Sequence, residues 1–365
     1  MDFVNSIMAS SFLILPLLLS LTLPLSYGKL VPAIFIFGDS VVDVGNNNDI
    51  PTIIKANFPP YGRNFINNTS TGRFSNGKLA TDFIAEMLGF DSYQPAYLSR
   101  EATGTNLLIG ANFASAASGL YDETAVLFNA IPLSKQLDNY KGYQEKVMEL
   151  VGTDNASLIF SRGIHLISAG NSDFLQNYYI NPLLNIAQTP EQFSNVLVQK
   201  FANLVEVCFL ISLTQQDLYG LGARKIGVTT LAPIGCLPTA ITLFGLGQNE
   251  CVERLNHDAL VFNEKLNATS ELMKNRFTDL VLVVFDIYQP LFDLISNPTE
   301  HGFSEVRRGC CGTGLFETSF LCTSLAVGTC TNASQYVFWD GFHPSEAANQ
   351  LLANDMIVAG QTFVP

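Results

Sequence analysis

Residues 33–40 read AIFIFGDS, a short apolar run that stops at a glycine, an aspartate and a serine. Similar apolar runs recur along the chain at Leu107–Ile109, Ile164–Ser168, Lys225–Thr229 and Leu280–Phe285. Longer stretches of helical character separate them. Short buried strands that alternate with helices are typical of a parallel sheet covered on both faces. The sequence therefore predicts an α/β fold built on a five-stranded parallel sheet, with AIFIF as its first strand.

Between these runs we expect helices at Lys78–Leu88, Leu133–Glu149, Pro190–Leu221 and Glu253–Phe277, the third being long enough to contain a break. The chain of 365 residues shows no internal repeat and no low-complexity linker, so we expect residues 29–365 to form one domain. In open parallel sheets, functional residues gather at the carboxyl ends of the strands. The loop after each predicted strand is therefore where we expect a functional site.

The composition argues against some classes of function. Charged residues make up 14% of the chain and hydrophobic residues 48%, a balance that does not suggest a disordered tail. The net charge is −13, so a surface that binds a polyanion is not expected. Nucleic acid is therefore not expected as a partner.

Residues 1–28 set the expected compartment. Phe12–Leu25 is an apolar run that is too short, and too interrupted by proline, for a membrane span. Ser26 and Gly28 fit the small-residue positions of a cleavage site. We therefore predict that residues 1–28 are a secretory signal peptide and that the mature chain has no stable membrane insertion. The N-terminus carries Asp2 and no basic residue, which is atypical, so a retained anchor or a buried N-terminal helix stays open.

Asn-x-Ser/Thr triplets give a second indication of export, because this triplet is the acceptor for N-glycosylation. Such triplets also occur by chance, so their weight is modest. The predicted glycosylation sites are Asn67, Asn68, Asn155, Asn267 and Asn332.

The cysteines give a third indication. Six of the seven lie in two groups that are typical of disulfide-stabilised loops: Cys236 with Cys251, and Cys310 with Cys311, Cys322 and Cys330. A zinc site in the second group is an alternative, but adjacent cysteines lack the two-residue gap of structural zinc motifs. Cys208, in an apolar run, is the expected unpaired thiol.

The loop after the first strand carries the strongest candidate for a catalytic residue. Ser40 stands at an expected strand-to-helix transition, where its amide can face a developing oxyanion. A helix cap is a common role of serine at such a position and stays open on this feature alone. The segment is not a Gly-x-Ser-x-Gly elbow, because Val42 stands two residues after Ser40.

A serine nucleophile needs a base, and the chain has four histidines. His343 stands three residues after Asp340 in a loop bounded by glycine and proline. Asp340 can accept the Nδ1 proton of His343, which leaves Nε2 free to take the proton of Ser40. The other histidines are weaker candidates: His165 lies in a predicted buried strand, His257 on a helix surface and His301 in a loop.

Six motifs occur in order along nearly all the mature chain: IFGDSVVDVGNN at 36–47, PPYG at 59–62, GRFSNG at 72–77, GANFASA at 110–116, PIGCLP at 233–238 and DGFHPS at 340–345. This set resembles the plant GDSL esterase/lipases, a branch of the SGNH hydrolases. The resemblance implies a flavodoxin-like three-layer α/β/α sandwich and ester hydrolysis without a metal or a cofactor. It also implies a catalytic Ser-Asp-His set on Ser40, Asp340 and His343.

Three positions depart from the pattern of that family. Val41 stands where the family has leucine, an apolar replacement, and Ala117 stands where the family often has glycine. Gly119 follows and is the expected backbone donor to the oxyanion. The third block reads Gly-Asn-Ser-Asp at 170–173 where the family has Gly-x-Asn-Asp, so Ser172 replaces the amide side chain that helps to bind the oxyanion.

The loss of one oxyanion donor can lower the rate by ~10²–10³. We therefore expect an oxyanion hole made by the amides of Ser40 and Gly119 together with a polar group at residue 171 or 172. Three accounts stay open: Ser172 donates its hydroxyl, Asn171 turns inward, or the site is weak. Turn formation alone is also a common role of both residue types.

The sequence thus predicts a secreted serine ester hydrolase that works through an acyl-enzyme on Ser40. The expected substrate is a lipid, a small acyl ester or an acetylated polysaccharide, and the expected location is the cell wall space, with the vacuole as an alternative. A non-catalytic secreted binding protein on the same fold and an acyltransferase are the other functions considered. The aromatic residues Phe174, Tyr178 and Tyr179 either line a substrate pocket or belong to the core.

Overall fold

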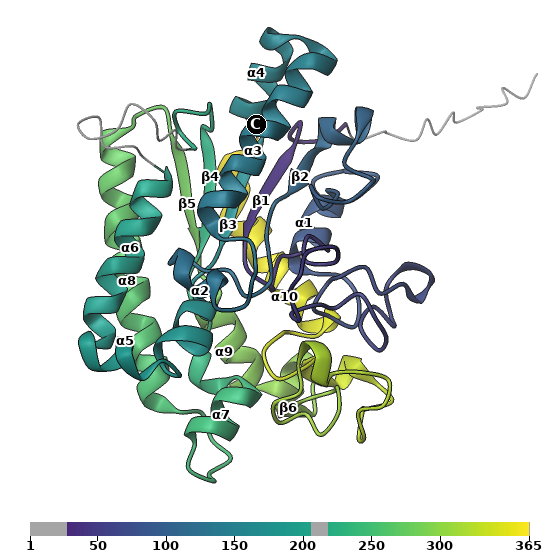
Figure 1. The fold of residues 1–365 in the computed structure, drawn as a ribbon, viewed down its shortest axis with the longest axis vertical. Helices are drawn as coiled ribbons and strands as arrows, with labels where there is room; N and C mark the ends of the chain where they lie inside the picture. Colours follow the sequence, from purple (N-terminus) through teal and green to yellow (C-terminus); the bar gives the residue numbers. More distant parts are fainter. Residues whose placement is uncertain (1–27, 206–217, 365) are drawn as a thin grey trace, which may run out of the picture.

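A computed structural model describes residues 28–205 and 218–364 of the chain (Figure 1). Its centre is a five-stranded sheet in the order β2-β1-β3-β4-β5, in which all neighbouring strands are parallel. The strands are β1 (Ile34–Gly38), β2 (Gly110–Asn112), β3 (Ile164–Ser168), β4 (Lys225–Thr229) and β5 (Val281–Phe285). The predicted α/β class and the five-stranded parallel sheet are confirmed.

The first strand shows why the chain forms a buried sheet. Successive side chains of a strand point to opposite faces, so an unbroken apolar run supplies both faces with core residues. Ile34 and Ile36 belong to the core on one face of the sheet. Phe35 and Phe37 belong to the core on the other face, where both rings contact Tyr140.

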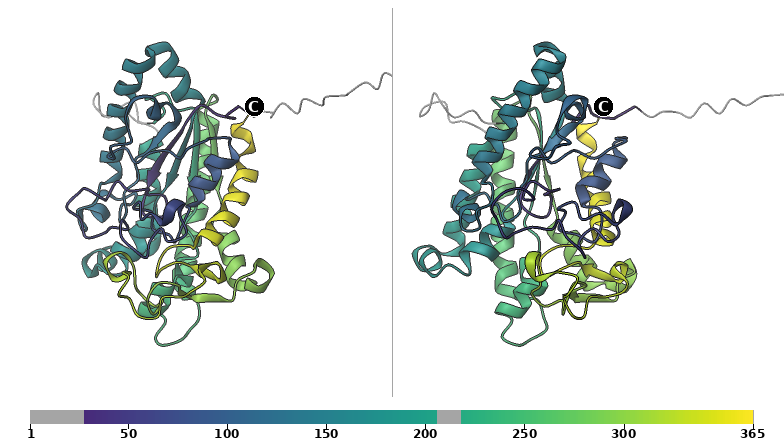
Figure 2. Two further views of the ribbon diagram at one scale, coloured as in Figure 1. Left: turned by 90° about the vertical axis from the view of Figure 1, so that its right-hand side faces the viewer. Right: turned by 45° about the vertical axis from the view of Figure 1, so that its right-hand side comes forward.

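Helices cover both faces and complete a three-layer α/β/α sandwich (Figure 2). The larger core lies under α3 (Leu133–Val151), α6 (Pro190–Val205) and α8 (Glu253–Arg276). The smaller core lies under α1 (Ala80–Met87) and α10 (Glu346–Ala359), which pack against each other. The remaining helices are α2 (Asp122–Val126), α4 (Thr153–Arg162), α5 (Pro182–Ala187), α7 (Pro238–Phe244) and α9 (Tyr288–Ser296).

A second, two-stranded sheet pairs β6 (Glu305–Gly309) with β7 (Tyr336–Phe338). The segment between these strands contains two disulfides, Cys310–Cys330 and Cys311–Cys322. The third disulfide, Cys236–Cys251, closes the loop after β4. Both predicted cysteine groups are therefore disulfide-bonded, and the zinc alternative for the second group is wrong.

One predicted strand is wrong. Leu107–Ile109 forms the end of a short 3-10 helix, η2 (Gly104–Ile109), and the strand starts one residue later at Gly110. The φ of Gly110 is +98°, and a Cβ there would overlap the backbone of Ile34 in β1. The close approach of β2 to β1 therefore has to begin at a glycine, after the apolar run has ended.

Other predictions lie partly or wholly outside the described residues. The predicted helix Pro190–Leu221 is described as α6 up to Val205, and Cys208 lies in the segment that is not described. Almost all of the predicted signal peptide, residues 1–28, also lies outside the described residues. Among the described helices, none combines the length and the apolar character that a membrane crossing requires.

Candidate active site

The loop after β1 places Ser40 at the carboxyl edge of the sheet. Gly38 has a φ of +142°, and a Cβ at this position would overlap the carbonyl oxygen of Ser168 in β3. The chain therefore turns where only glycine fits, and the amide of Asp39 donates to that same carbonyl oxygen at 3.0 Å. The helix expected after the strand is absent, because residues 40–42 form a turn. Ser40 thus does not cap a helix.

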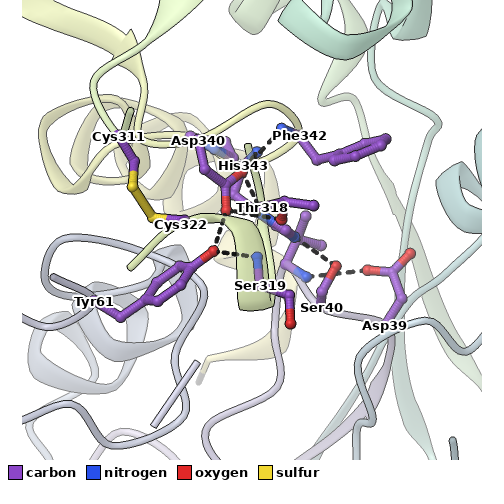
Figure 3. A network of polar contacts seen from close by, with 12 residues as sticks. Asp39, Ser40, Tyr61, Cys311, Thr318, Ser319, Cys322, Asp340, Phe342 and His343 are labelled. Atoms are coloured by element: carbon purple, nitrogen blue, oxygen red, sulfur yellow. Dashed lines mark hydrogen bonds and ion pairs between the residues drawn. A yellow bond between two sulfur atoms is a disulfide. The ribbon is translucent and has the colours of Figure 1, made fainter. Parts of the chain in front are cut away.

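Ser40, His343 and Asp340 form one chain of hydrogen bonds (Figure 3). The distance from Ser40 Oγ to His343 Nε2 is 2.6 Å, and the distance from His343 Nδ1 to Asp340 Oδ1 is 2.7 Å. Because an ionised carboxylate only accepts hydrogen bonds, this network assigns the proton to Nδ1 and leaves Nε2 as the acceptor of the serine hydroxyl. Such an arrangement can remove the proton of a serine as it attacks a carbonyl group.

The loop that carries Asp340 and His343 is closed on itself. The amides of Phe342 and His343 both donate to Asp340 Oδ1 at 2.9 Å, and the amide of Trp339 donates to the carbonyl oxygen of His343. Ser345 then caps α10 by accepting a hydrogen bond from the amide of Ala348. The short spacing between acid and imidazole thus forms a tight turn between β7 and α10.

Two hydroxyl groups from distant parts of the chain hold the other oxygen of Asp340. Tyr61 donates to Oδ2 at 2.7 Å and Thr318 donates to it at 3.0 Å. The amide of Ser319 donates in turn to the hydroxyl of Tyr61 at 2.7 Å (Figure 3). Burial and the neighbouring carboxylate of Asp340 raise the pKa of Tyr61 well above its ordinary value, so its hydroxyl remains a donor.

The disulfide Cys311–Cys322 closes the loop that presents Thr318 and Ser319. Inside this loop the carboxylate of Glu317 accepts hydrogen bonds from the amides of Thr313 and Leu315. The carbonyl oxygen of Glu317 accepts the amide of Gly341, next to Asp340. The loop is therefore attached directly to the segment that carries the acid. Neither Tyr61 nor Thr318 was predicted as a site residue from the sequence, although Tyr61 belongs to the PPYG motif.

Asp39 is a second buried carboxyl group beside Ser40. Its Oδ1 accepts the amide of Val41 at 3.1 Å, and the backbone of Ser172 and the imidazole of His343 also interact with this carboxyl group. Burial raises the pKa of Asp39 to about 7, and the amide of Val41 opposes this rise. Burial also raises the pKa of Asp173 to about 7 and that of Asp43 to about 6.

Asn171 and Ser172 follow β3 and face the same cavity as Ser40. The Oδ1 atom of Asn171 accepts the amide of Ala232 at 3.1 Å, which leaves the Nδ2 group of this amide side chain as its remaining donor. Ser172 is buried, and it is the residue directly before the π-helix η3 (Asp173–Tyr178).

Gly119 is placed differently from the other predicted oxyanion donors. It packs against the carboxylate of Asp173, which a Cβ at residue 119 would overlap, and it is not among the residues that line the cavity. The following amides, of Leu120 and Tyr121, donate to that carboxylate. Ala117 has a φ of +66°, a left-handed conformation that costs a non-glycine residue roughly 1 kcal/mol. This conformation explains why glycine suits position 117.

The cavity beside Ser40 has about 870 Å³ of empty space, its mouth included. Among the described residues that line it, Asp39 and His343 are the ionisable ones. Most of the others are apolar: Val41, Val42, Ala80, Leu166, Leu175, Ala232, Leu237, Ile287, Leu291, Phe342, Leu352 and Met356. Phe174, Tyr178 and Tyr179 do not line this cavity, and the first two are buried in the core.

The other histidines lie away from this arrangement. His165 is buried in β3, where Tyr140 bonds to its Nε2 at 2.7 Å and burial lowers its pKa to about 3. His301 pairs with Asp293, and His257 is exposed on α8. Within residues 28–205 and 218–364, no cluster of three or more histidine, cysteine or acidic residues could hold a metal ion.

The five predicted glycosylation sites are all exposed. Asn155 lies in α4 and Asn267 in α8, whereas Asn67 and Asn68 form a surface turn. The side chain of Asn332 accepts the amide of Ser334. Exposure is compatible with glycosylation, which stays a prediction at each of these sites.

Comparisons with known proteins give a consistent result. A family model described as GDSL-like Lipase/Acylhydrolase matches residues 34–356. The chain is 63% identical to GDSL esterase/lipase At5g03810 of Arabidopsis thaliana, with 91% of each chain covered. It is 58% identical to GDSL esterase/lipase At3g53100 of the same plant, over 93% of this chain and 94% of the relative. It is 54% identical to GDSL esterase/lipase APG of Arabidopsis thaliana, over 97% of this chain and 98% of the relative.

The raised pKa of Asp39 predicts a pH dependence of stability. Between the ordinary value of 3.8 and the folded value of about 7, the folded chain holds a proton that the unfolded chain has released. The free energy of unfolding therefore falls as the pH rises through this window, and this contribution levels off above it. Asp39→Asn, which cannot titrate, should show a shallower fall, measured by urea unfolding from about pH 4 to pH 8.

Asp138→Asn, which removes an exposed carboxylate from α3, controls for the loss of one negative charge. Part of the fall should persist in Asp39→Asn, because Asp43 and Asp173 titrate in the same direction. A slope equal to that of the wild type would contradict the assignment of a raised pKa to Asp39.

Proposed function

Because the chain belongs to the GDSL-like lipase/acylhydrolase family and is a carboxylic-ester hydrolase, we propose that Ser40, His343 and Asp340 carry out its reaction. The observation that supports this proposal is the continuous hydrogen-bond chain from Ser40 Oγ through His343 to Asp340. All three side chains are buried, so little water competes for these hydrogen bonds.

The proposed reaction has two halves. His343 Nε2 takes the proton of Ser40 while Oγ attacks the ester carbonyl carbon, and the carbonyl oxygen becomes an oxyanion. As the tetrahedral intermediate collapses, the bond to the alcohol oxygen breaks and His343 protonates the leaving alcohol. Water then attacks the acyl-enzyme, with His343 again as the base, and the carboxylic acid leaves as Ser40 recovers its proton. Asp340 orients the imidazole and stabilises its charged form.

The oxyanion is proposed to bind the amide of Ser40 and the side chains that follow β3. The Nδ2 group of Asn171 is a donor whose partner oxygen is fixed by Ala232, so the amide is oriented before substrate binds. Ser172 lines the same cavity, and its hydroxyl can supply a second donor. Gly119, which lies against Asp173, stays a predicted donor through its backbone amide.

The lining of the cavity supports an ester with an apolar acyl group. Apolar side chains gain free energy by covering hydrocarbon, whereas the hydroxyl groups of a sugar need polar partners. A lipid or a small acyl ester therefore fits the acyl side of the site better than an acetylated polysaccharide would.

We further propose that the protein is secreted and works in the cell wall space. The three disulfides support this location, because such bonds persist in oxidising compartments. The exposure of all five predicted glycosylation sites is compatible with passage through the secretory route.

The nucleophile is tested by hydrolysis of p-nitrophenyl acetate and p-nitrophenyl octanoate. Ser40→Ala should lower kcat by roughly 10⁴-fold or more, because Ser40 carries the hydroxyl that bonds to His343 Nε2. Ser304→Ala, which changes an exposed serine before β6, is the control and should keep the wild-type rate. Wild-type activity in folded Ser40→Ala would refute the assignment. Product analysis with added alcohols separates hydrolysis from transfer, because only transfer gives a new ester.

The oxyanion donors are separated by three variants. Asn171→Asp keeps the oxygen that accepts the Ala232 amide and loses the N–H donor, so kcat should fall by ~10²-fold or more with little change in KM. Ser172→Ala should lower kcat less if Asn171 is the main donor. Ser172→Asn restores the family residue, and a rise in kcat would show that the site lacks a donor there. An unchanged kcat in Asn171→Asp would exclude Asn171 from the oxyanion hole.

A further inference from the structure

The cavity beside Ser40 continues away from the mouth, along the face of the sheet that α10 covers. Its lining includes Leu166 in the middle of β3 and Met356 near the C-terminal end of α10. These two side chains belong to the smaller core, on the same face as Ile34 and Ile36 of β1.

A second cavity lies on that same face. It has about 390 Å³ of empty space, the open solvent at its own mouth included, and its lining residues include Ile84 in α1, Leu88 directly after α1, Ile164 in β3, and Phe285 and Phe363. Leu166 and Met356 line this cavity as well as the first one. The two side chains therefore stand between the cavities and form the partition that separates them.

We propose that the two cavities form one channel for the acyl chain of the substrate, and that Met356 sets the length of chain that the enzyme accepts. This inference rests on the proposed function, because the channel starts at Ser40 as the nucleophile. A short acyl group occupies only the first cavity. A longer chain reaches Met356 and has to displace its side chain before it enters the second cavity.

The chemistry of the lining selects hydrocarbon as the occupant. The residues that line the second cavity are apolar, with one glycine, so a polar group there would lose its hydrogen bonds to water without replacement. The polar residues of the first cavity are in part already paired, since the hydroxyl of Thr229 donates to Ser168. Each methylene that enters such a lining should raise kcat/KM about fourfold, until the chain reaches the partition.

The two residues of the partition differ in their freedom to move. Leu166 stands on the central strand, where the neighbouring strands β1 and β4 hold its backbone. Met356 has an unbranched side chain with three rotatable bonds, a shape that adapts to its surroundings. It also lies in the last turns of α10, close to the C-terminal end of that helix. Met356 is therefore the member of the pair that can yield to an acyl chain.

The test compares kcat/KM for the p-nitrophenyl esters of acetate, butyrate, octanoate, laurate and palmitate. In the wild type, kcat/KM should rise with chain length and then fall once the chain meets Met356. In Met356→Ala, the optimum should move to a longer ester, with the laurate-to-butyrate ratio increasing roughly tenfold or more, because several more methylenes are buried. Met356→Phe should move the optimum to a shorter ester.

Met273→Ala is the matched control. Met273 is as buried as Met356, at 4% exposure, but it belongs to the larger core on the opposite face of the sheet. Its truncation should cost similar stability and leave the optimum in place. An optimum that stays unchanged in active Met356→Ala would overturn the inference and leave the proposed function intact. A wild-type protein that hydrolyses none of the five esters would overturn both the inference and the proposed function.

A second measurement on the wild-type protein does not depend on the folding of a variant. Lauric acid with a diazirine at its terminal carbon is bound as the product, irradiated, and its cross-links are mapped by mass spectrometry. Cross-links on α10 near Met356, or on Phe363, would support the channel. Cross-links confined to the mouth, on Phe342 or Gln176, would overturn it.

Discussion

The buried carboxylate of Asp340 is the constraint on which the site depends. A carboxylate without access to water costs several kcal/mol unless hydrogen bonds replace its hydration. The donors come from three separate parts of the chain: its own loop, Tyr61 in the segment before α1, and Thr318 in the disulfide loop. These three segments have to assemble around the carboxylate of Asp340. The hydrogen bonds that they donate fix this carboxylate, and the carboxylate in turn orients the imidazole of His343 toward Ser40.

Two disulfides stabilise the loop that donates one of these hydrogen bonds to Asp340. Residues 310–335 contain little regular structure, and short 3-10 turns alone would not hold Thr318 against Asp340. Cys311–Cys322 closes the loop around Glu317, and Cys310–Cys330 ties the same segment to the end of β6. The guanidinium group of Arg63 donates to the carbonyl oxygen of Cys330 and covers the ring of Trp339, which joins this segment to the region of Tyr61. Covalent closure thus adds to the small apolar cluster that the disulfide cysteines form with Tyr61, Phe74 and Trp339.

The sequence predicts what depends on local pattern and misses what depends on contact. The strands Ile164–Ser168 and Lys225–Thr229 match the structure, because an apolar run between helices has few alternatives. The spacing of Asp340 and His343 predicted their hydrogen bond, since a three-residue turn leaves little freedom. The helix expected after Ser40 does not form, because Asp39 and Asp43 bind nearby amides and favour turns instead. Tyr61 and Thr318 lie 279 and 22 residues from Asp340, so no local pattern could connect them to the acid.

The central claim is that Ser40 is the nucleophile, activated by His343. It is tested most directly with an ethyl fluorophosphonate, which loses fluoride when a serine oxygen attacks phosphorus and remains covalently bound. Intact-mass analysis of the wild type should show one adduct, peptide mapping should place it on Ser40, and His343→Gln should react far more slowly. An adduct on another residue, or equal labelling of Ser40→Ala, would contradict the account.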